Sequence, residues 1–302
     1  MMQEQLLHGV VGVMRSAGFQ VSERCSVRPR SFDLIAADGA LVVIKVVSHI
    51  DSVTEEIAWD MDVISRYLGG YPLIVGEKAR DSLLERGAVY IRYGIFAISL
   101  ETLHDYFVEK IPPLVYASPG GLYVNIDGDL LRKLRENYQL SLGDLAHILG
   151  VSRRTISKYE SGMGTTLDVA ARIEELFDTA IAVAIDILKS RPPHVPSPEP
   201  PAVHLPPDIE RMGMEPHGMR RAPFDALVIF KTHRIITGYG SVEKAERHAP
   251  FIGNISQVAR THALCITTDE TRKRWIGSTL IIGERKLRGL EDGSELIELI
   301  QN

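Results

Sequence analysis

The sequence contains little cysteine, and its two cysteines, Cys25 and Cys265, lie far apart and outside any C-x-x-C pattern. This excludes a disulfide framework, argues against a zinc site and is typical of a reducing compartment. The 10 histidines are scattered without the spacing of metal ligands, and no glycine-rich loop that would cradle a phosphate is present. We therefore expect neither a metal site nor a cofactor.

Long apolar runs are also missing, because no stretch approaches the ~20 residues that a membrane span requires. The first 20 residues place Glu4, His8 and Arg15 between apolar side chains at helical spacing, which predicts an amphipathic helix rather than a signal peptide. We expect a cytoplasmic protein without a membrane partner. The net charge is -5, so no overall positive field is present, although a weakly acidic chain can still carry a local basic face.

The chain has 302 residues, which suffice for two or three domains. The predicted secondary structure changes along it. Strand and helix patterns alternate at both ends, a block with only helical patterns follows the first, and a proline-rich stretch follows that block. Such a stretch favours an extended spacer. The predicted units are an α/β domain over 1–124, an all-α domain over 125–190, a Pro-rich linker over 191–220 and a second, smaller α/β domain over 221–302.

The first α/β domain opens with the amphipathic helix, and an Asp-Gly turn then joins its first two strands. Gly69 and Gly70 end the next helix. The predicted elements are strands at 32–35, 41–47, 72–76, 88–91 and 95–98, helices at 52–68 and 100–107, and a closing hairpin over 114–124 around Pro119, Gly120 and Gly121.

The helical domain carries its strongest signal from Leu140 to Gly162, where two short helices are joined by a tight turn. Ser141 can cap the first helix, and Asp144 favours the positive end of the helix dipole. Gly150 supplies the left-handed conformation that ends this helix, and Ser152 caps the second.

The second helix, over residues 152–160, has two different faces. Ile156 and Tyr159 point back to the core. The outward side chains are basic or carry hydroxyls: Arg153, Arg154, Thr155, Ser157 and Lys158. Such a helix behind a tight glycine turn indicates a helix-turn-helix, although a solvated basic face on an ordinary bundle would look similar.

This segment resembles the Cro/cI repressor-like (XRE-type) helix-turn-helix domains. Residues 130–137 are similar to their first helix, and 167–177 and 181–188 to their fourth and fifth, which implies a five-helix domain. Leu142 stands where many members carry glutamine, so no operator preference follows. The resemblance implies binding of double-stranded DNA by Ser141, Ser152, Arg153, Arg154, Thr155, Ser157 and Lys158.

Groove chemistry supplies the expected mechanism. An arginine can donate two hydrogen bonds to O6 and N7 of guanine, worth ~1–3 kcal/mol of discrimination. Hydroxyls and helix amino termini bind phosphates and set the register. One helix-turn-helix reads a half-site, so we expect a homodimer on half-sites ~34 Å apart. Another hypothesis is that an α/β domain senses a small-molecule effector, but no feature of the sequence points to such a ligand.

The stretch from Ser31 to Val46 resembles the start of the restriction-endonuclease-like fold. Asp33 matches the first acid, Lys45 matches the lysine, and Glu4 could supply an additional acid. Val43 stands where the second carboxylate belongs. Because two carboxylates normally hold the Mg²⁺ that activates water, we expect a degenerate domain with no catalytic residues. The alternatives are a metal-dependent nuclease or resolvase guided by the helix-turn-helix, and an ordinary cross-strand pair in an α/β core.

The second α/β domain shows a weak repeat of the first at an offset between about 190 and 194 positions. Asp225 matches Asp33, but the lysine pattern is absent. Alternatively, any two α/β segments share such short matches without a common origin. The matched pairs are 31–34 with 223–226, 72–75 with 263–266, and 100–107 with 294–300.

The whole order of units resembles a family of archaeal helix-turn-helix transcriptional regulators. The resemblance implies an archaeal source and a role in transcription regulation, without indicating target genes. The segments that carry it are Phe32-Asp33, 68–73, 92–94, 119–123 and 151–160.

Overall fold

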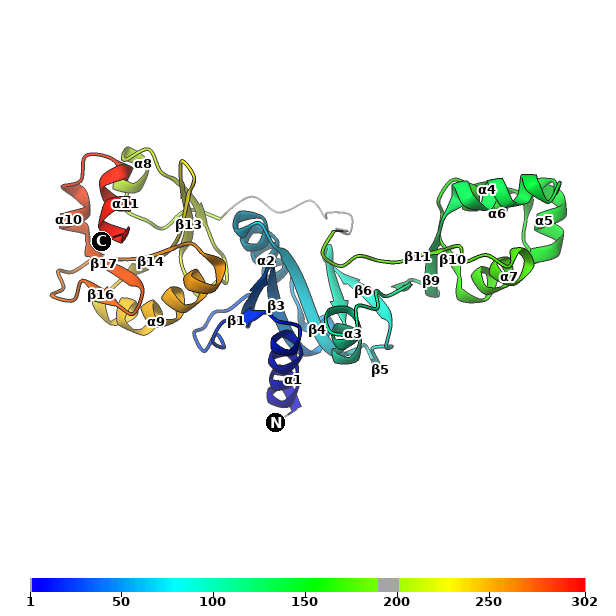
Figure 1. Ribbon diagram of the computed structural model, residues 1–302. Coiled ribbons are helices and arrows are strands. Elements are labelled where there is room, and N and C mark those ends of the chain that lie inside the picture. The colour runs from blue at the N-terminus through cyan, green and yellow to red at the C-terminus, as the bar shows by residue number, and fades with distance from the viewer. Residues whose placement is uncertain (1, 190–200, 302) are drawn as a thin grey trace.

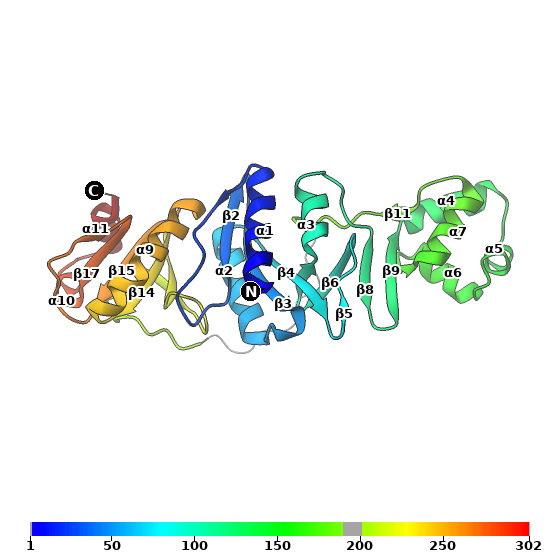
Figure 2. The same cartoon turned by 90° about the horizontal axis from the view of Figure 1, so that it is seen from below.

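The computed structural model describes residues 2–189 and 201–301. Figures 1 and 2 show an elongated molecule with the helical unit at one end, the N-terminal α/β unit in the middle and the C-terminal α/β unit at the other end. Within the described ranges, no helix is both long and apolar enough to cross a membrane.

The N-terminal unit is a mixed sheet between helices, in the order β1-β2-β3-β4-β7-β6. Strand β3 is antiparallel to β2 and parallel to β4, which is parallel to β7. The elements are α1 (Met2–Ser16), β1 (Gln20–Val21), β2 (Leu34–Asp38), β3 (Ala40–His49), a 3-10 turn (Ile50–Ser52), α2 (Glu55–Leu68), β4 (Tyr71–Ala79), β5 (Ser82–Leu83), β6 (Ala88–Arg92), β7 (Ile95–Ile98) and α3 (Leu100–Phe107).

Strand β3 is buried on both faces, which explains its nearly continuous apolar run. Its residues Val42 and Ile44 pack under α1 and α3, whereas Val43 and Val47 pack under α2. The helix predicted from Ser52 begins later, because Ile50–Ser52 forms the 3-10 turn and Thr54 caps α2 by accepting a bond from the Ile57 N–H.

The C-terminal unit has the corresponding strand order β12-β13-β14-β15-β17-β16. Strand β14 is antiparallel to β13 and parallel to β15, which is parallel to β17. The elements are α8 (Asp208–Arg211), β12 (Glu215–Gly218), β13 (Ala226–Phe230), β14 (His233–Gly240), α9 (Val242–Ala259), β15 (His262–Thr267), β16 (Trp275–Ile276), β17 (Thr279–Gly283), α10 (Glu284–Arg288) and α11 (Gly293–Gln301).

This unit begins earlier than the predicted boundary at 221. Ile209, Met212 and Met214 are buried in its core, so α8 and β12 belong to the domain. The predicted spacer over 191–220 therefore does not extend to 220, because the apolar residues between Pro207 and Pro216 pack into the core of the C-terminal unit. Residues 190–200 of that prediction lie outside the described residues.

The two α/β units share one hydrophobic core. Phe32, fully buried beside β2, lies 6.4 Å from Phe224 and 6.2 Å from Phe251 between ring centroids. On α2, the Tyr67 hydroxyl donates to the Val228 carbonyl of β13. Buried Asp60 accepts bonds from the backbone N–H groups of residues 220 and 221, at 3.0 and 2.6 Å.

The sheet of the N-terminal unit continues from β6 through β8, β9 and β10, and the helical unit rests on this extension rather than on helices alone. The prediction of a fifth helix over 181–188 is wrong, because Ala182 and Val183 pair with β9 as a strand. The chain then runs back to the N-terminal unit, where the Ile185 N–H donates to the Pro113 carbonyl at 2.8 Å. Alternating β-branched residues at 181, 183, 185 and 187 favour this extended path. The elements are β8 (Val115–Ser118), β9 (Gly121–Ile126), α4 (Gly128–Asn137), α5 (Leu142–Leu149), α6 (Arg153–Glu160), β10 (Thr165–Thr166), α7 (Leu167–Phe177) and β11 (Ala182–Val183).

Candidate nucleic-acid interface

The first helix of the turn, α5, is held at both ends by its own sequence. Ser141 and Asp144 form the capping box, since the Ser141 Oγ accepts from the Asp144 N–H at 3.1 Å and the Asp144 carboxylate accepts from the Ser141 N–H at 2.9 Å. Those bonds hold the pKa of Asp144 below its usual value. Gly150 ends the helix at a φ of 66°, and the Val151 N–H reaches the Ala146 carbonyl at 3.0 Å.

The second helix, α6, is anchored along its inner face. Ser152 caps it by accepting from the Thr155 N–H at 3.1 Å, and the two hydroxyls lie 2.8 Å apart. Ile156 and Tyr159 are buried, as predicted. A Cβ on Gly128 would lie 2.6 Å from the Tyr159 carbonyl oxygen, so only glycine lets α4 pass this close to the end of α6.

A buried ion pair that the sequence analysis missed fixes the end of α6. Glu160 is 7% exposed, and its carboxylate accepts from the Arg135 Nε at 2.5 Å. Arg132 lies 3.5 Å away on the same carboxylate. This bonding raises the pKa of Arg135. The only signal in the sequence was an acid at the end of one predicted helix and two arginines in the predicted helix two helices earlier.

The outward face of α6 places the predicted contact residues together. Ser152, Arg153, Arg154, Ser157 and Lys158 are exposed, and Thr155 is partly exposed. Across the described chain, the three cations of this face form no side-chain ion pair or hydrogen bond, in contrast to Arg172 of α7, which is bonded to Asp168 at 2.7 Å.

Ser141 joins the same surface from the preceding helix. It is exposed at the start of α5, and a Cβ on Gly143 would lie 3.6 Å from the Arg153 Nε, so the first turns of α5 and α6 are neighbours. The amino termini of both helices and the three free cations therefore form one surface, called here the α6 face: Ser141, Ser152, Arg153, Arg154, Thr155, Ser157 and Lys158. Such a surface can bind phosphates and reach base edges.

The nuclease-like motif has a different environment. Asp33 is 2% exposed, and its carboxylate oxygens contact the Arg30 Nε at 3.1 Å, the Lys45 Nζ at 3.4 Å and the Val46 N–H at 2.8 Å. Burial lowers the pKa of Lys45, while the Asp33 carboxylate acts in the opposite direction. Arg30 was not anticipated; its guanidinium pairs with the Asp33 carboxylate that a metal ion would also require.

The remaining parts of the motif do not assemble an acid pair. Val43 is fully buried opposite Ile35. Glu4, considered as an additional acid, is paired with Arg24 at 3.1 Å on the surface. In the parts of the chain that the structure covers, no group of three or more His, Cys, Asp or Glu could hold a metal ion.

The corresponding acid of the C-terminal unit is neutralised in the same manner. The Asp225 carboxylate accepts from the Tyr239 N–H at 2.7 Å, and the Lys244 Nζ lies 2.8 Å from one of its oxygens. In each α/β unit a cation of the chain itself therefore occupies the carboxylate that a metal would need.

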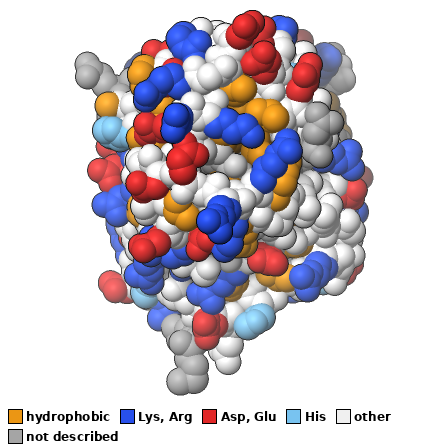
Figure 3. All heavy atoms as spheres, turned by 90° about the vertical axis from the view of Figure 1, so that its left-hand side faces the viewer, with side chains coloured by type: hydrophobic (Ala, Val, Ile, Leu, Met, Phe, Trp, Pro, Cys, Tyr) orange, Lys and Arg blue, Asp and Glu red, His pale blue; other side chains and the backbone are white. Residues whose placement is uncertain are grey.

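The outer end of the C-terminal unit carries both signs of charge. Figure 3 shows Lys and Arg side chains interspersed with Asp and Glu side chains over this end. Mixed charges of this kind do not create an extended field of one sign. The free cations of the α6 face are therefore the clearer place for contact with an anionic polymer.

Comparisons with known proteins agree with the arrangement of units. A model described as a PD-(D/E)XK superfamily domain matches residues 3–113, and one described as helix-turn-helix matches residues 131–183. No solved structure matches the chain.

Similar full-length proteins share the name "Putative HTH-type transcriptional regulatory protein". The one from Methanoregula boonei is 59% identical, over 99% of this chain and 96% of its own length. The one from Methanoculleus marisnigri is 58% identical, over 99% of each. The one from Methanocella arvoryzae is 41% identical, over 99% of this chain and 96% of its own length.

Proposed function

The chain belongs to the archaeal family of HTH-type transcriptional regulatory proteins, and we propose that it binds DNA sequence-specifically by placing α6 in the major groove. One observation carries the proposal: Arg153, Arg154 and Lys158 are exposed on α6 without a side-chain hydrogen bond or ion pair in the described ranges, while the inner face of α6 is fixed by Ile156 and the Glu160 ion pair. Rigid support with free outward cations is what groove recognition requires.

The roles within the α6 face follow from side-chain chemistry. Arg153 and Arg154 donate to O6 and N7 of guanine, each pair of bonds worth ~1–3 kcal/mol of discrimination. Lys158 contacts a base edge or a nearby phosphate, and the hydroxyls with the helix amino termini position the phosphate backbone.

Reading a two-part operator requires a homodimer, with half-sites ~34 Å apart. The core shared by the α/β units is already filled within one chain, so the subunits meet through another surface. Light scattering of the chain, free and bound to DNA, tests this: a monomer in both samples contradicts the dimer. The proposed location is the cytoplasm, where DNA is accessible in an archaeal cell.

The α/β units act as a scaffold rather than as an enzyme in this proposal, and they are a degenerate repeat. Their matching strand orders and matching carboxylate-to-backbone bonds at Asp33 and Asp225 support duplication. Phe32 and Phe224, which occupy equivalent positions, contact each other. Contact between equivalent residues is the mark of a two-fold interface, so the repeats pack as a dimer within one chain.

A nuclease guided by the helix-turn-helix is the second candidate, favoured by the PD-(D/E)XK match to residues 3–113. Incubation of duplex and branched DNA with Mg²⁺ or Mn²⁺ separates the two. Intact DNA agrees with the scaffold, whereas metal-dependent cutting that disappears in Asp33→Ala establishes the nuclease.

A gel-shift series tests the regulator directly, using Arg153→Ala/Arg154→Ala against Arg272→Ala/Arg274→Ala, which removes the same charge from the exposed β15–β16 loop. We expect the first variant alone to lose preference for the selected site over random duplex. A loss shared by both variants points to charge in general and contradicts the assignment. Salt is varied in parallel, because phosphate contacts set the salt slope.

A further inference from the structure

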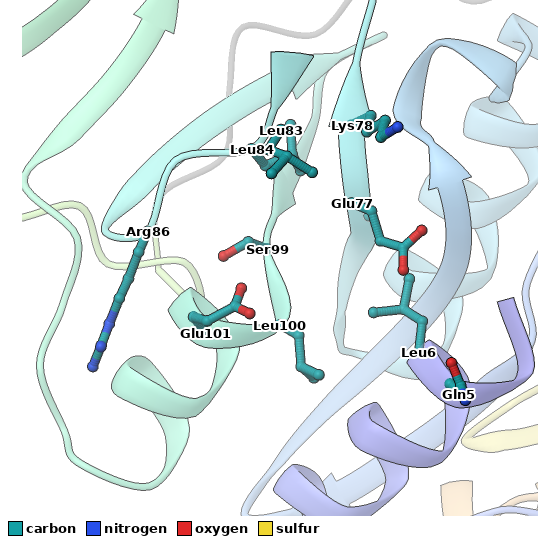
Figure 4. A pocket seen from close by; sticks show the side chains of 11 residues that line it. Gln5, Leu6, Glu77, Lys78, Leu83, Leu84, Arg86, Ser99, Leu100 and Glu101 are labelled. Carbon is teal, nitrogen blue, oxygen red and sulfur yellow. The ribbon is translucent and has the colours of Figure 1, made fainter. Parts of the chain in front are cut away.

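A cleft in the N-terminal unit lies away from the α6 face and from the Asp33 motif. Its volume is about 660 Å³, a size common for small-molecule sites. It lies at the carboxyl ends of the neighbouring parallel strands β4 and β7, between the first turns of α1 and α3 (Figure 4). Ligands of α/β sheets bind at this edge.

The walls of the cleft are apolar. Leu6 comes from α1, Leu84 from the turn after β5, and Leu100 from α3. The backbone N–H of Leu84 donates to the Glu77 carbonyl at 2.8 Å, which fixes that wall against β4. An apolar stem of a few carbons fits such a lining.

Two carboxylates give the cleft its charge. Glu77 extends from β4 beside Leu6, and Glu101 extends from the first turn of α3 beside Ser99 (Figure 4). The Oε2 atom of Glu77 is buried without a hydrogen-bond partner in the described structure. A buried carboxylate oxygen without a donor is unfavourable, so the site favours a ligand that brings one.

The cations in the lining do not satisfy these carboxylates. Arg86 gives both of its bonds to Asp105, at 2.7 Å each. Lys78 follows Glu77 on β4, and successive side chains on a strand point to opposite faces, so it leaves the strand away from Glu77. Within the described residues neither cation forms an ion pair or a hydrogen bond with Glu77 or Glu101, and Arg86 interacts with Glu101 only electrostatically.

We propose that this cleft binds a small diamine with an apolar stem, with one ammonium on Glu77, the other on Glu101 and the stem on the leucines. The inference goes beyond DNA binding and does not depend on it. The far end of α3 contacts the segment that returns from the helical unit, because the Tyr106 hydroxyl donates to Asp186 at 2.5 Å. An occupied cleft is thus joined through one helix to the base of the DNA-binding unit.

Calorimetric titration of the full chain tests the site with three probes of equal length: 1,5-diaminopentane, 1,5-pentanediol and glutarate. We expect the diamine to bind at least tenfold more tightly than the diol, and glutarate not to bind. Equal affinity for the diamine and the diol, or no diamine binding, overturns the proposal.

Matched variants locate the binding. Glu77→Gln and Glu101→Gln should each weaken diamine binding about tenfold, whereas Glu85→Gln, which removes the same charge from an exposed residue outside the lining, should leave it unchanged. An equal loss of diamine affinity in all three variants would show that binding depends on net charge alone and would overturn the proposed site. Because Glu101 is exposed, Glu101→Gln keeps the test valid if Glu77→Gln folds poorly. Hydrogen exchange should slow on diamine binding at 77–86 and 99–107, and protection confined to other regions contradicts the site.

Discussion

Phe32→Ala should destabilise both α/β units at once, although the substitution lies in only one of them. Phe32 is fully buried and contacts Phe224 and Phe251 of the other unit. Truncating a buried phenylalanine costs about 3–5 kcal/mol, and part of that loss falls on the contacts between the units. With an m value of about 2–3 kcal/mol/M, the urea midpoint should fall by about 1–2.5 M.

The chain offers a separate probe for each unit, because its two tryptophans are Trp59 on α2 and Trp275 on β16. Single-tryptophan variants, Trp275→Phe and Trp59→Phe, therefore report the two units independently during urea unfolding. With Phe32 in place, we expect the two single-tryptophan variants to unfold at the same urea concentration. Adding Phe32→Ala should lower the urea midpoint in both.

Phe177→Ala is the matched control, since Phe177 is buried in the separate core of the helical unit. It should leave both tryptophan transitions in place. If Phe32→Ala moves the Trp59 transition and leaves the Trp275 transition unchanged, the shared core does not couple the units and the reasoning fails.

Three further predictions follow from other sites. Burial raises the pKa of Asp60 from 3.8 to about 6. The stability that this shift gives is therefore complete below pH ~4 and is lost as the pH rises through ~6. Relative to Asp60→Asn, the free energy of unfolding should fall by about 2–3 kcal/mol between pH 4 and 7, and parallel pH profiles would refute this. Gly150→Ala should destabilise the helical unit by about 1–2 kcal/mol, because φ is 66° there, whereas Gly12→Ala in open space on α1 should stabilise its helix slightly; hydrogen exchange of the α5 and α1 amides measures both. Adding Mg²⁺ should not raise the Tm, because Arg30 and Lys244 already neutralise the two carboxylates; a metal-dependent rise abolished by Asp33→Ala would show a working site.

Local signals were enough to predict much of the fold and the position of the α6 face. Ser141, Gly150 and Ser152 act within a few residues of themselves, so the caps and the turn could be read directly, and the structure confirms them. The 100–107 helix and the 119–121 turn are confirmed for the same reason. Family membership, stated first as a resemblance, is confirmed by relatives that match along nearly the whole chain.

Long-range features could not be read in this way. The family resemblance predicted a helix over 181–188, but β9, the partner of this segment, lies more than fifty residues earlier, and that pairing decides its extended form. The proline-rich composition gave no sign that Ile209 and Met212 are core residues, because their burial depends on strands that come later in the sequence. Arg30 looks like an ordinary charged loop residue until the fold places its guanidinium on Asp33.

Selection of bound sites from a random duplex library tests the central claim most directly, with the parent chain and Arg153→Ala/Arg154→Ala compared side by side. We expect the unsubstituted chain to select a recurring motif that contains guanines, and the double variant to fold normally without enriching those guanines. An unchanged motif in the double variant, with binding retained, would contradict recognition through α6.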